Sequence, residues 1–245
     1  MSGWLAGRVL ENRAWTETLF SLRVAAPALR FEAGQFVRIA LEVDGERVAR
    51  PFSFVNAPED PVLEFYGVVV PEGPLSPRLA RLRPGDGLQV ADNPSGWLIL
   101  SEVPPAEELW LVATGTGIAP FLSILRSEAP WQRYRRVILV HGARQARELV
   151  YRELLGRIRS DRDRFQYLTL VSRESHPASL AGRIPAALRD GRLEQAAVPI
   201  APQRSQFMLC GNPDMLKDMT AALAERGLKK HRRRSPGQIT VESFW

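Results

Sequence analysis

The stretch LVATGTGIAPFL, residues 111–122, is the clearest indication of the fold of the second half of this chain. It continues an apolar run, ELWLVAT (108–114), that is typical of a buried strand in a parallel sheet. Gly115 and Gly117 follow, and IAPFLSILRS (118–127) has helical spacing, with Pro120 near the first turn, where proline is tolerated. A strand, a glycine turn and a helix predict backbone N–H groups that approach a phosphate or a flat ring. A tight turn without a ligand also explains the pattern, since Pro120 replaces the third glycine of a dinucleotide fingerprint.

Strands and helices alternate after this turn. The runs RVILVHGA (136–143), FQYLTLVS (165–172), QFMLCG (206–211) and QITVESF (238–244) read as strands. ELVYRELLGRIRS (148–160) and NPDMLKDMTAALAERG (212–227) read as helices, and Gly227 closes the second. We therefore expect residues 106–245 to form an α/β domain with a parallel sheet covered by helices on both faces.

The first hundred residues follow a different pattern. Short β-type runs, among them TLFSLRV (18–24), QFVRIALEV (35–43), VLEFYGVVV (62–70) and GLQVAD (87–92), alternate with turn residues. LSPRLARL (75–82) is the one short helical interruption. Many short strands with frequent turns predict a small antiparallel barrel over residues 1–101. The proline-rich, acidic stretch SEVPPAEE (101–108) marks the join.

Composition and the absence of certain motifs restrict the classes of protein to which this chain can belong. The 245 residues are 45% hydrophobic and 24% charged, typical of a globular protein with a substantial core. No apolar run reaches the length of a membrane span, and the start lacks a signal-peptide layout, so we expect a cytoplasmic protein and no membrane partner. A single cysteine excludes internal disulfides and disfavours cysteine-bound metal centres. No HExxH metal spacing and no GxSxG nucleophile motif is present, so no metal is expected.

The segment RVARPFSFVN (47–56) carries a second pattern. Side chains alternate along a strand, so Arg50 and Phe52 share one face, and Ser53 points the other way unless the strand bends or ends there. That face offers a cation for a phosphate and a ring for stacking. Each residue also has an ordinary explanation, because phenylalanine is often core and arginine often a surface charge.

Taken together, these motifs resemble a family. RPFS (50–53), FYGVVV (65–70), GPLSPRL (73–79), ATGTGIAP (113–120), CGNPDM (210–215) and a terminal aromatic pair occur in the order seen in ferredoxin–NADP⁺ reductases, above all the bacterial ferredoxin/flavodoxin enzymes. The resemblance runs from about Trp4 to Trp245. It implies an FAD-binding barrel followed by an NADP-binding α/β domain. The family usually has Arg-x-Tyr-Ser, so Phe52 keeps the ring and lacks the hydroxyl.

The resemblance assigns roles in holding FAD. Arg50 would pair with the pyrophosphate, Phe52 would pack on the isoalloxazine, and Ser53 would lie within reach of flavin N5. The C-terminal rings, Phe244 and Trp245, would cover the isoalloxazine face opposite Phe52 and the adenine of a bent FAD. The full FAD set is Arg50, Pro51, Phe52, Ser53, Tyr66, Gly67, Val68, Leu75, Ser76, Thr116, Phe244 and Trp245.

The second domain would hold NADP(H). Arg144 follows the second predicted strand of this domain, Arg173 follows the third, and Arg183 comes further along in LAGRIP (180–185). This placement at or just beyond strand ends, together with the resemblance, favours NADP over NAD, because cations suit a 2′-phosphate. Asn212-Pro213 reads as a helix cap without any ligand, while the resemblance places this turn at the nicotinamide. The full NADP set is Gly115, Gly117, Arg144, Ser172, Arg173, Arg183, Gly211, Asn212 and Pro213.

Residues for the reaction come from the resemblance too. It places Ser53, Cys210 and Glu242 beside the site of hydride transfer between NADP(H) and FAD. Cys210 would make a contact without acting as a nucleophile, because no histidine or second cysteine is near it in sequence. Glu242 reads equally well as an exposed charge at a strand end.

Charge indicates the class of partner. The formal charge is +6, and the run KKHRRR (229–234) is its densest part. An acidic ferredoxin or flavodoxin would suit this charge, and a monomer is expected. The run is also typical of a solvated loop. Two alternatives stay open: the reductase component of an oxygenase or an NADPH diaphorase, and more distantly a basic module that binds nucleic acid or another anion. The run lacks the interleaved aromatics of a nucleic-acid site, so no nucleic acid is expected.

Overall fold

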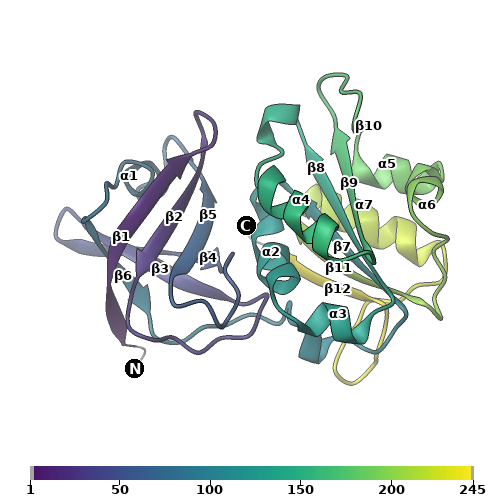
Figure 1. The fold of residues 1–245 in the computed structure, drawn as a ribbon, viewed down its shortest axis with the longest axis horizontal. Helices are drawn as coiled ribbons and strands as arrows, with labels where there is room; N and C mark the ends of the chain where they lie inside the picture. The colour runs from purple at the N-terminus through teal and green to yellow at the C-terminus, as the bar shows by residue number, and fades with distance from the viewer. Residues whose placement is uncertain (1–2, 244–245) are drawn as a thin grey trace. The chain divides into compact units, whose positions relative to one another are not determined.

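The computed structural model describes residues 3–243 and divides them between two compact units. The first unit comprises residues up to Ile99 together with Ala119–Ser127, and the second comprises Leu100–Ile118 and the chain from Glu128 onward. Each unit has its own sheet (Figure 1). None of the helices among the described residues combines the length and apolar character that crossing a bilayer requires.

The first unit is an antiparallel barrel with strand order β4-β3-β6-β1-β2-β5. The curl closes where Phe54, just after β4, bridges Phe65 of β5. Phe20, Leu22, Ile39, Phe54 and Phe65 belong to its buried core. The strands and the short helix are β1 (Trp4–Ala14), β2 (Leu19–Ala25), β3 (Phe36–Val43), β4 (Glu46–Ser53), β5 (Leu63–Val68), α1 (Ser76–Leu79) and β6 (Gly87–Ala91).

Helix α2 (Ala119–Arg126) packs in the first unit although it follows a strand of the second. The Arg126 guanidinium forms salt bridges with Glu64 and Asp60, each at 2.8 Å. The Ser123 hydroxyl donates to the carbonyl of Asn56 at 2.7 Å, and both residues are buried. Arginine forks and buried hydroxyl bonds are directional, so they fix the helix in one orientation on the barrel.

The second unit contains a six-stranded parallel sheet of order β10-β9-β8-β7-β11-β12. Its strands are β7 (Glu108–Thr114), β8 (Arg136–Ala143), β9 (Phe165–Val171), β10 (Leu180–Ala181), β11 (Ser205–Gly211) and β12 (Ile239–Ser243). The interior strands are continuous apolar runs, as expected for a sheet buried on both faces. The predicted strands after residue 106 are thus confirmed, and β10 is an addition.

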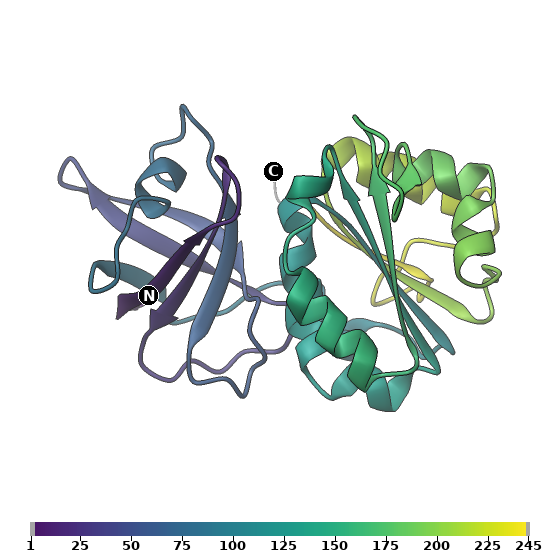
Figure 2. The same ribbon diagram turned by 45° about the horizontal axis from the view of Figure 1, so that its top comes forward.

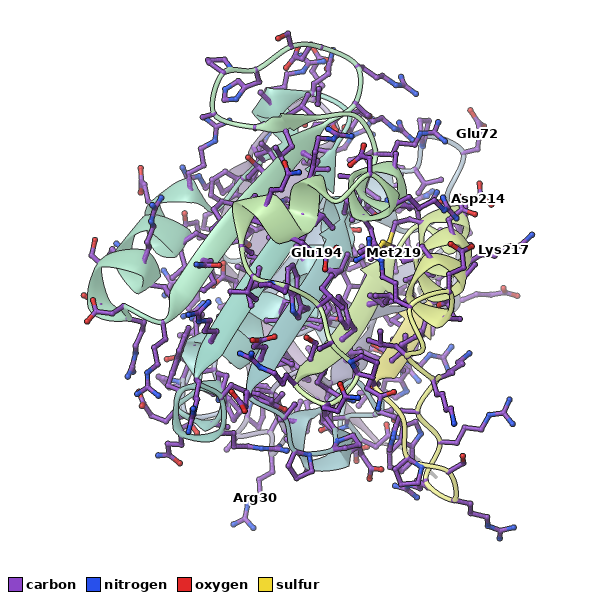
Figure 3. All side chains as sticks on the ribbon, turned by 90° about the vertical axis from the view of Figure 1, so that its right-hand side faces the viewer. Arg30, Glu72, Glu194, Asp214, Lys217 and Met219 are labelled. Atoms are coloured by element: carbon purple, nitrogen blue, oxygen red, sulfur yellow. The ribbon has the colours of Figure 1, made fainter. Side chains whose placement is uncertain are left out.

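Helices cover the two faces of this sheet (Figure 2). One face packs on α5 (Ile184–Arg189), α6 (Arg192–Ala196) and α7 (Pro213–Ala224), through a core that includes Trp110, Phe207 and Met219. Helix α4 (Arg152–Asp161) lies against β9 on the other face. Asp214 and Lys217 project outward from α7 (Figure 3). The remaining short elements are η1 (Leu100–Glu102), η2 (Gly115–Ile118), α3 (Ala129–Arg133) and η3 (Ala146–Glu148).

Candidate functional site for a flavin and a nicotinamide nucleotide

The glycine turn after β7 lies against the end of β11. η2 begins at Gly115, whose φ of 54° is left-handed, a region that favours glycine. A Cβ at Gly117 would lie 2.6 Å from the carbonyl oxygen of Cys210 and 2.7 Å from the Cα of Gly211. Only glycine permits this approach of two backbones. The predicted residues Gly115, Gly117, Cys210 and Gly211 are therefore brought together at the carboxyl edge of the sheet.

The turn after β11 is fixed from both sides. The amide of Asn212 donates to the Thr114 hydroxyl at 2.9 Å, which ties this turn to the end of β7. The Asn212 side chain accepts from the amides of Asp214 and Met215 at 2.9 and 3.2 Å, and Pro213 is the first residue of α7. The predicted helix cap is confirmed. The amino terminus of the twelve-residue α7 thus begins at this same edge.

Cys210 is buried within the sheet. It pairs in register with Ala113 of β7 and with Glu242 of β12. Burial raises the pKa of the Cys210 thiol well above its ordinary value, and the charge of Glu242 raises it further. A thiol held neutral is a poor nucleophile, which agrees with the expectation that Cys210 does not act as one. Glu242 lies next to it in the ladder and is half-buried, so it is not the fully exposed strand-end charge that its position near the terminus allowed.

One buried histidine at this edge was not among the predicted site residues. His141 pairs with Ala113 in the ladder between β7 and β8, and its exposed fraction is 0%. Its Nδ1 lies 3.3 Å from the Tyr167 hydroxyl. Burial lowers the pKa of His141 from 6.5 to about 4, although a hydrogen bond with the Gly115 backbone acts in the opposite direction. The imidazole is therefore neutral at pH 7. A histidine inside an otherwise apolar strand, VILVHGA, was the available signal.

The predicted arginine set lies at one corner of the sheet. Ala143 of β8 pairs with Val171 of β9, and Val171 pairs with Ala181 of β10. Arg144 comes one residue past this register line, and Arg173 and Arg183 come two residues past it. Neighbouring strands are about 4.8 Å apart, so this placement brings the three backbones close together. Arg144 and Arg173 are joined directly, by the bond from the Arg173 amide to the Arg144 carbonyl at 2.9 Å. Ser172 bonds to Ala143 through its amide at 3.1 Å.

The barrel brings the RPFS residues to the end of β4. Arg50 and Pro51 are exposed and Phe52 is half-buried, whereas Ser53 ends the strand and is 3% exposed. The Ser53 hydroxyl is buried and has no hydrogen-bond partner within residues 3–243. A buried hydroxyl left without a partner is costly, so an unmatched donor at this position indicates a polar ligand atom.

The second predicted FAD segment lies beside the first. A Cβ at Gly67 of β5 would lie 2.8 Å from Cε1 of Phe52, so the phenylalanine ring packs on the glycine. Tyr66 is 3% exposed and Val68 is half-buried. Ser76 opens α1, and its hydroxyl accepts from the amide of Val70 at 2.9 Å. This bond leaves the hydroxyl proton available to a phosphate. Leu75, the residue before α1, is buried.

These donor sets fit the two nucleotides. The barrel offers an exposed arginine for phosphate, a ring for stacking and an unpartnered buried hydroxyl, which are the groups that an FAD requires. The α/β unit offers a close-packed glycine turn, the start of α7 and an arginine corner, which suit a phosphorylated nicotinamide nucleotide. Thr116 lies in η2. Phe244 and Trp245 lie outside the described residues. No group of three metal-ligating side chains occurs within residues 3–243.

The basic run, Lys229–Arg234, forms a hairpin at the end of the same sheet where the parallel strands begin. Lys230 bridges Ile239, the first residue of β12, and Arg232 and Ser235 exchange two backbone hydrogen bonds. Arg233 binds Glu102 through two contacts, at 2.9 and 2.7 Å, and this pairing lowers the pKa of Glu102. The hairpin therefore lies at the amino ends of the strands, away from the glycine turns at their carboxyl ends.

Comparison with known proteins assigns one family model to each half of the chain. A family model described as an oxidoreductase FAD-binding domain matches residues 11–97, and one described as an oxidoreductase NAD-binding domain matches residues 111–221. The flavodoxin/ferredoxin–NADP reductases of Shigella flexneri and Escherichia coli K12 are 48% and 47% identical over 100% of both chains.

Solved structures give the same result. A crystal structure of a ferredoxin NADP⁺ reductase from Neisseria gonorrhoeae with bound FAD and NADP matches with a TM-score of 0.94 and 33% identity, covering 99% of each chain. The predicted fold class, an antiparallel FAD-binding barrel with a parallel-sheet NADP-binding domain, is confirmed. The chain belongs to the flavodoxin/ferredoxin–NADP reductase family and is an FAD-dependent oxidoreductase that uses NADP(H).

Proposed function

We propose that the residues grouped at these two sites carry the family's reaction in this chain, with ferredoxin, flavodoxin or both as the electron partner. FAD, when bound, accepts a hydride from NADPH and releases electrons one at a time. The observation that carries the assignment is the Ser53 hydroxyl, buried at the end of β4 without a partner in the described chain. Because this hydroxyl is already removed from water in the flavin-free protein, flavin binding adds no further desolvation cost for it.

The barrel residues would bind and orient the flavin. Arg50, exposed next to the half-buried Phe52, would hold phosphate oxygens through its planar fork while the phenylalanine ring covers the isoalloxazine. Ser53 would donate its hydroxyl proton at flavin N5. Tyr66, Gly67 and Val68 would line the ring, and Leu75 and Ser76 would meet the phosphates, with the Ser76 proton free to donate.

The residues of the α/β unit would place the nicotinamide. The turn at Gly115, Thr116 and Gly117 and the turn at Gly211, Asn212 and Pro213 are tied together at one edge, so both would contact the same nucleotide. Cys210 and Glu242 would flank the nicotinamide, and the neutral thiol would exclude water without attacking the ring. Arg144, Ser172, Arg173 and Arg183 would bind the 2′-phosphate.

Partner choice follows from names and charge. The relatives from Shigella flexneri and Escherichia coli are named for both flavodoxin and ferredoxin. A formal charge of +6 favours acidic partners of this kind. Because the Lys229–Arg234 hairpin lies at the amino edge of its sheet, its charges would steer an approaching partner at long range rather than contact the nicotinamide edge. We further propose that the protein acts as a monomer in the cytoplasm, in line with its single cysteine.

One titration tests whether the protein binds flavin, whether a nicotinamide nucleotide reduces that flavin, and whether NADPH is preferred over NADH. The purified protein should be yellow, and its flavin absorbance should bleach at much lower concentrations of NADPH than of NADH. Turnover with purified ferredoxin and flavodoxin should fall as salt rises, because charged docking is screened. A colourless protein that releases no flavin on denaturation overturns the proposal. Turnover with small acceptors only would point instead to a diaphorase.

The C-terminal aromatic pair has its own test. If Phe244 and Trp245 cover the flavin, their deletion should weaken FAD retention and alter NADP(H) affinity. Flavin release during dialysis and NADP⁺ titration of the truncated and full chains measure the two effects. A truncation that changed thermal stability alone would make the pair ordinary core.

A further inference from the structure

One acidic side chain joins the two loops that carry Arg144 and Arg173. Glu174 comes directly after Arg173 in the loop between β9 and β10. Its Oε1 accepts a hydrogen bond from the amide of Ala146 at 2.6 Å, across to the loop after β8. The backbone hydrogen bonds that connect these two segments within residues 3–243 come earlier, from the amide of Ser172 to Ala143 at 3.1 Å and from the amide of Arg173 to Arg144 at 2.9 Å. Glu174 therefore extends the connection beyond the end of the ladder.

The donor that Glu174 meets is the first amide of a short turn. η3 (Ala146–Glu148) has Gln145 before it as its cap, and Glu148 closes a capping box with that residue. Glu148 Oε2 also accepts from the Arg144 amide at 2.9 Å. The turn that follows Arg144 is thus held by two carboxylates, one from its own loop and one from the neighbouring loop. Charge-assisted hydrogen bonds of this kind are short and directional.

The same bonds determine what the two glutamates do to the arginines. Each carboxylate is turned toward backbone amides, and no salt bridge joins a carboxylate to Arg144, Arg173 or Arg183 among the described residues. The guanidinium groups thus keep their donors for a ligand. Since loops are the mobile part of such a site, a bond that fixes both loops reduces the ordering that a bound dianion must impose.

We propose that Glu174 is a positioning residue that sets the preference of this chain for NADP(H) over NAD(H), by holding the loops of Arg144 and Arg173 in the spacing that a 2′-phosphate requires. The inference rests on the proposed function, in which these arginines bind that phosphate. The charge of Glu174 taken alone leads to the opposite expectation. A carboxylate beside a phosphate site repels the ligand by ordinary electrostatics, and an acidic residue near this corner would on simple grounds favour the ribose hydroxyl of NAD. The two accounts predict opposite signs for the removal of Glu174.

Three variants of the full holoprotein separate the accounts. Glu174→Ala removes the acceptor, and Glu174→Gln keeps an acceptor oxygen without the charge. Ala146→Pro removes the donor and leaves Glu174 intact. Proline suits the first position of a turn, and Gln145 before it has φ −129° and ψ 151°, the extended conformation that a residue preceding proline adopts. Glu225→Ala is the matched control, because it removes an exposed carboxylate at the far end of α7.

Calorimetric titration with adenosine 2′,5′-bisphosphate and with 5′-AMP measures the affinity of the proposed 2′-phosphate site without turnover. We expect Glu174→Ala and Ala146→Pro each to weaken binding of the bisphosphate about three- to tenfold, the range of one solvent-exposed hydrogen bond. Their double variant should lose no more than either alone, since both remove the same bond. Glu174→Gln should lie close to the wild type, and 5′-AMP affinity should not change in any variant. In kinetics, KM for NADPH should rise by the same factor while kcat and KM for NADH stay constant.

Every other outcome overturns the inference. Tighter bisphosphate binding in Glu174→Ala and Glu174→Gln would mean that the carboxylate acts by repulsion. Unchanged binding, or a change shared by Glu225→Ala, would mean that Glu174 does not act on the site. Equal losses of bisphosphate affinity in Glu174→Ala and Glu174→Gln would show that the hydrogen bond to Ala146 is not the cause of the effect. Arg173→Ala separates this inference from the proposed function: if it fails to weaken bisphosphate binding, the arginine assignment is wrong, whereas its success with no effect of Glu174→Ala rejects Glu174 alone.

Discussion

The buried His141 makes stability depend on pH in a window where few other groups titrate. The imidazole is 0% exposed, and burial lowers its pKa from 6.5 to about 4. The unfolded chain therefore binds a proton at pH 5 that the folded chain does not. Because the folded pKa is the lower one, the contribution to stability is fully present above pH 6.5 and is lost progressively as the pH falls toward 4.

The size of the effect follows from these two values. Each unit of pKa difference corresponds to about 1.4 kcal/mol. Between pH 7 and pH 5 the unfolded histidine becomes almost fully protonated while the folded one stays neutral, so about 2 kcal/mol of unfolding free energy should be lost over that interval. Ordinary carboxylates stay ionised above pH 5, so they add little to the slope there.

Urea denaturation at pH 5, 6 and 7, in constant excess FAD, measures the slope. His141→Asn keeps a polar group near Nδ1 and removes the titration, so its stability should be lower overall and nearly independent of pH over this range. Tyr167→Phe should keep the wild-type slope, because desolvation and not the tyrosine hydroxyl is the main cause of the shift. Parallel curves for the wild type and His141→Asn would refute the reasoning.

Three further changes test other parts of the structure. Gly117→Ala places a Cβ 2.6 Å from the Cys210 carbonyl oxygen, so it should cost about 1–3 kcal/mol of unfolding free energy and weaken NADP⁺ binding; unchanged titrations in urea and NADP⁺ would show that the turn can shift. Ser53→Ala removes a hydroxyl that lacks a partner in the described chain, so the FAD-free protein should be no less stable while flavin reduction by NADPH, followed by stopped flow, slows roughly a hundredfold. Arg126→Leu breaks the 2.8 Å ion pair with Glu64 and should cost about 1–3 kcal/mol of unfolding free energy, after allowance for partial exposure. The double variant Arg126→Leu/Glu64→Leu should recover part of this loss in the same denaturation assay, and strictly additive losses would contradict the ion pair.

Patterns in the sequence predicted most of the fold because each unit follows one periodicity. The alternating strands of the barrel and the apolar strands of the parallel sheet both gave correct segments, and Asn212-Pro213 gave a correct helix cap. The helix after the glycine turn was also expected, but not its place on the barrel. That placement depends on Arg126 meeting Glu64, whose sequence separation is 62, and no local pattern encodes such a contact.

The candidate site divides in the same way. Glycine turns and arginines after strand ends were visible, because their positions follow from topology. His141 was not assigned to the site, since its contact is with Tyr167 on the adjacent strand β9, 26 residues away in sequence. Glu174, which we propose as a positioning residue, gave no local signal for a similar reason, because its partner amide belongs to another loop. Residues that act through a second residue leave little trace in their own sequence neighbourhood.

The membership of α2 in the barrel unit has a consequence for how the protein is made. On the ribosome, residues 1–99 emerge first, but the Asn56 carbonyl and the Glu64 and Asp60 carboxylates then have neither Ser123 nor Arg126. The first unit can be completed only after Leu100–Ile118 and the helix itself have been synthesised. No single cut in the chain yields both units whole, so gene fusions or truncations that treat residue 100 as a clean border should yield an unfinished barrel. The two units are joined in assembly order as well as in sequence.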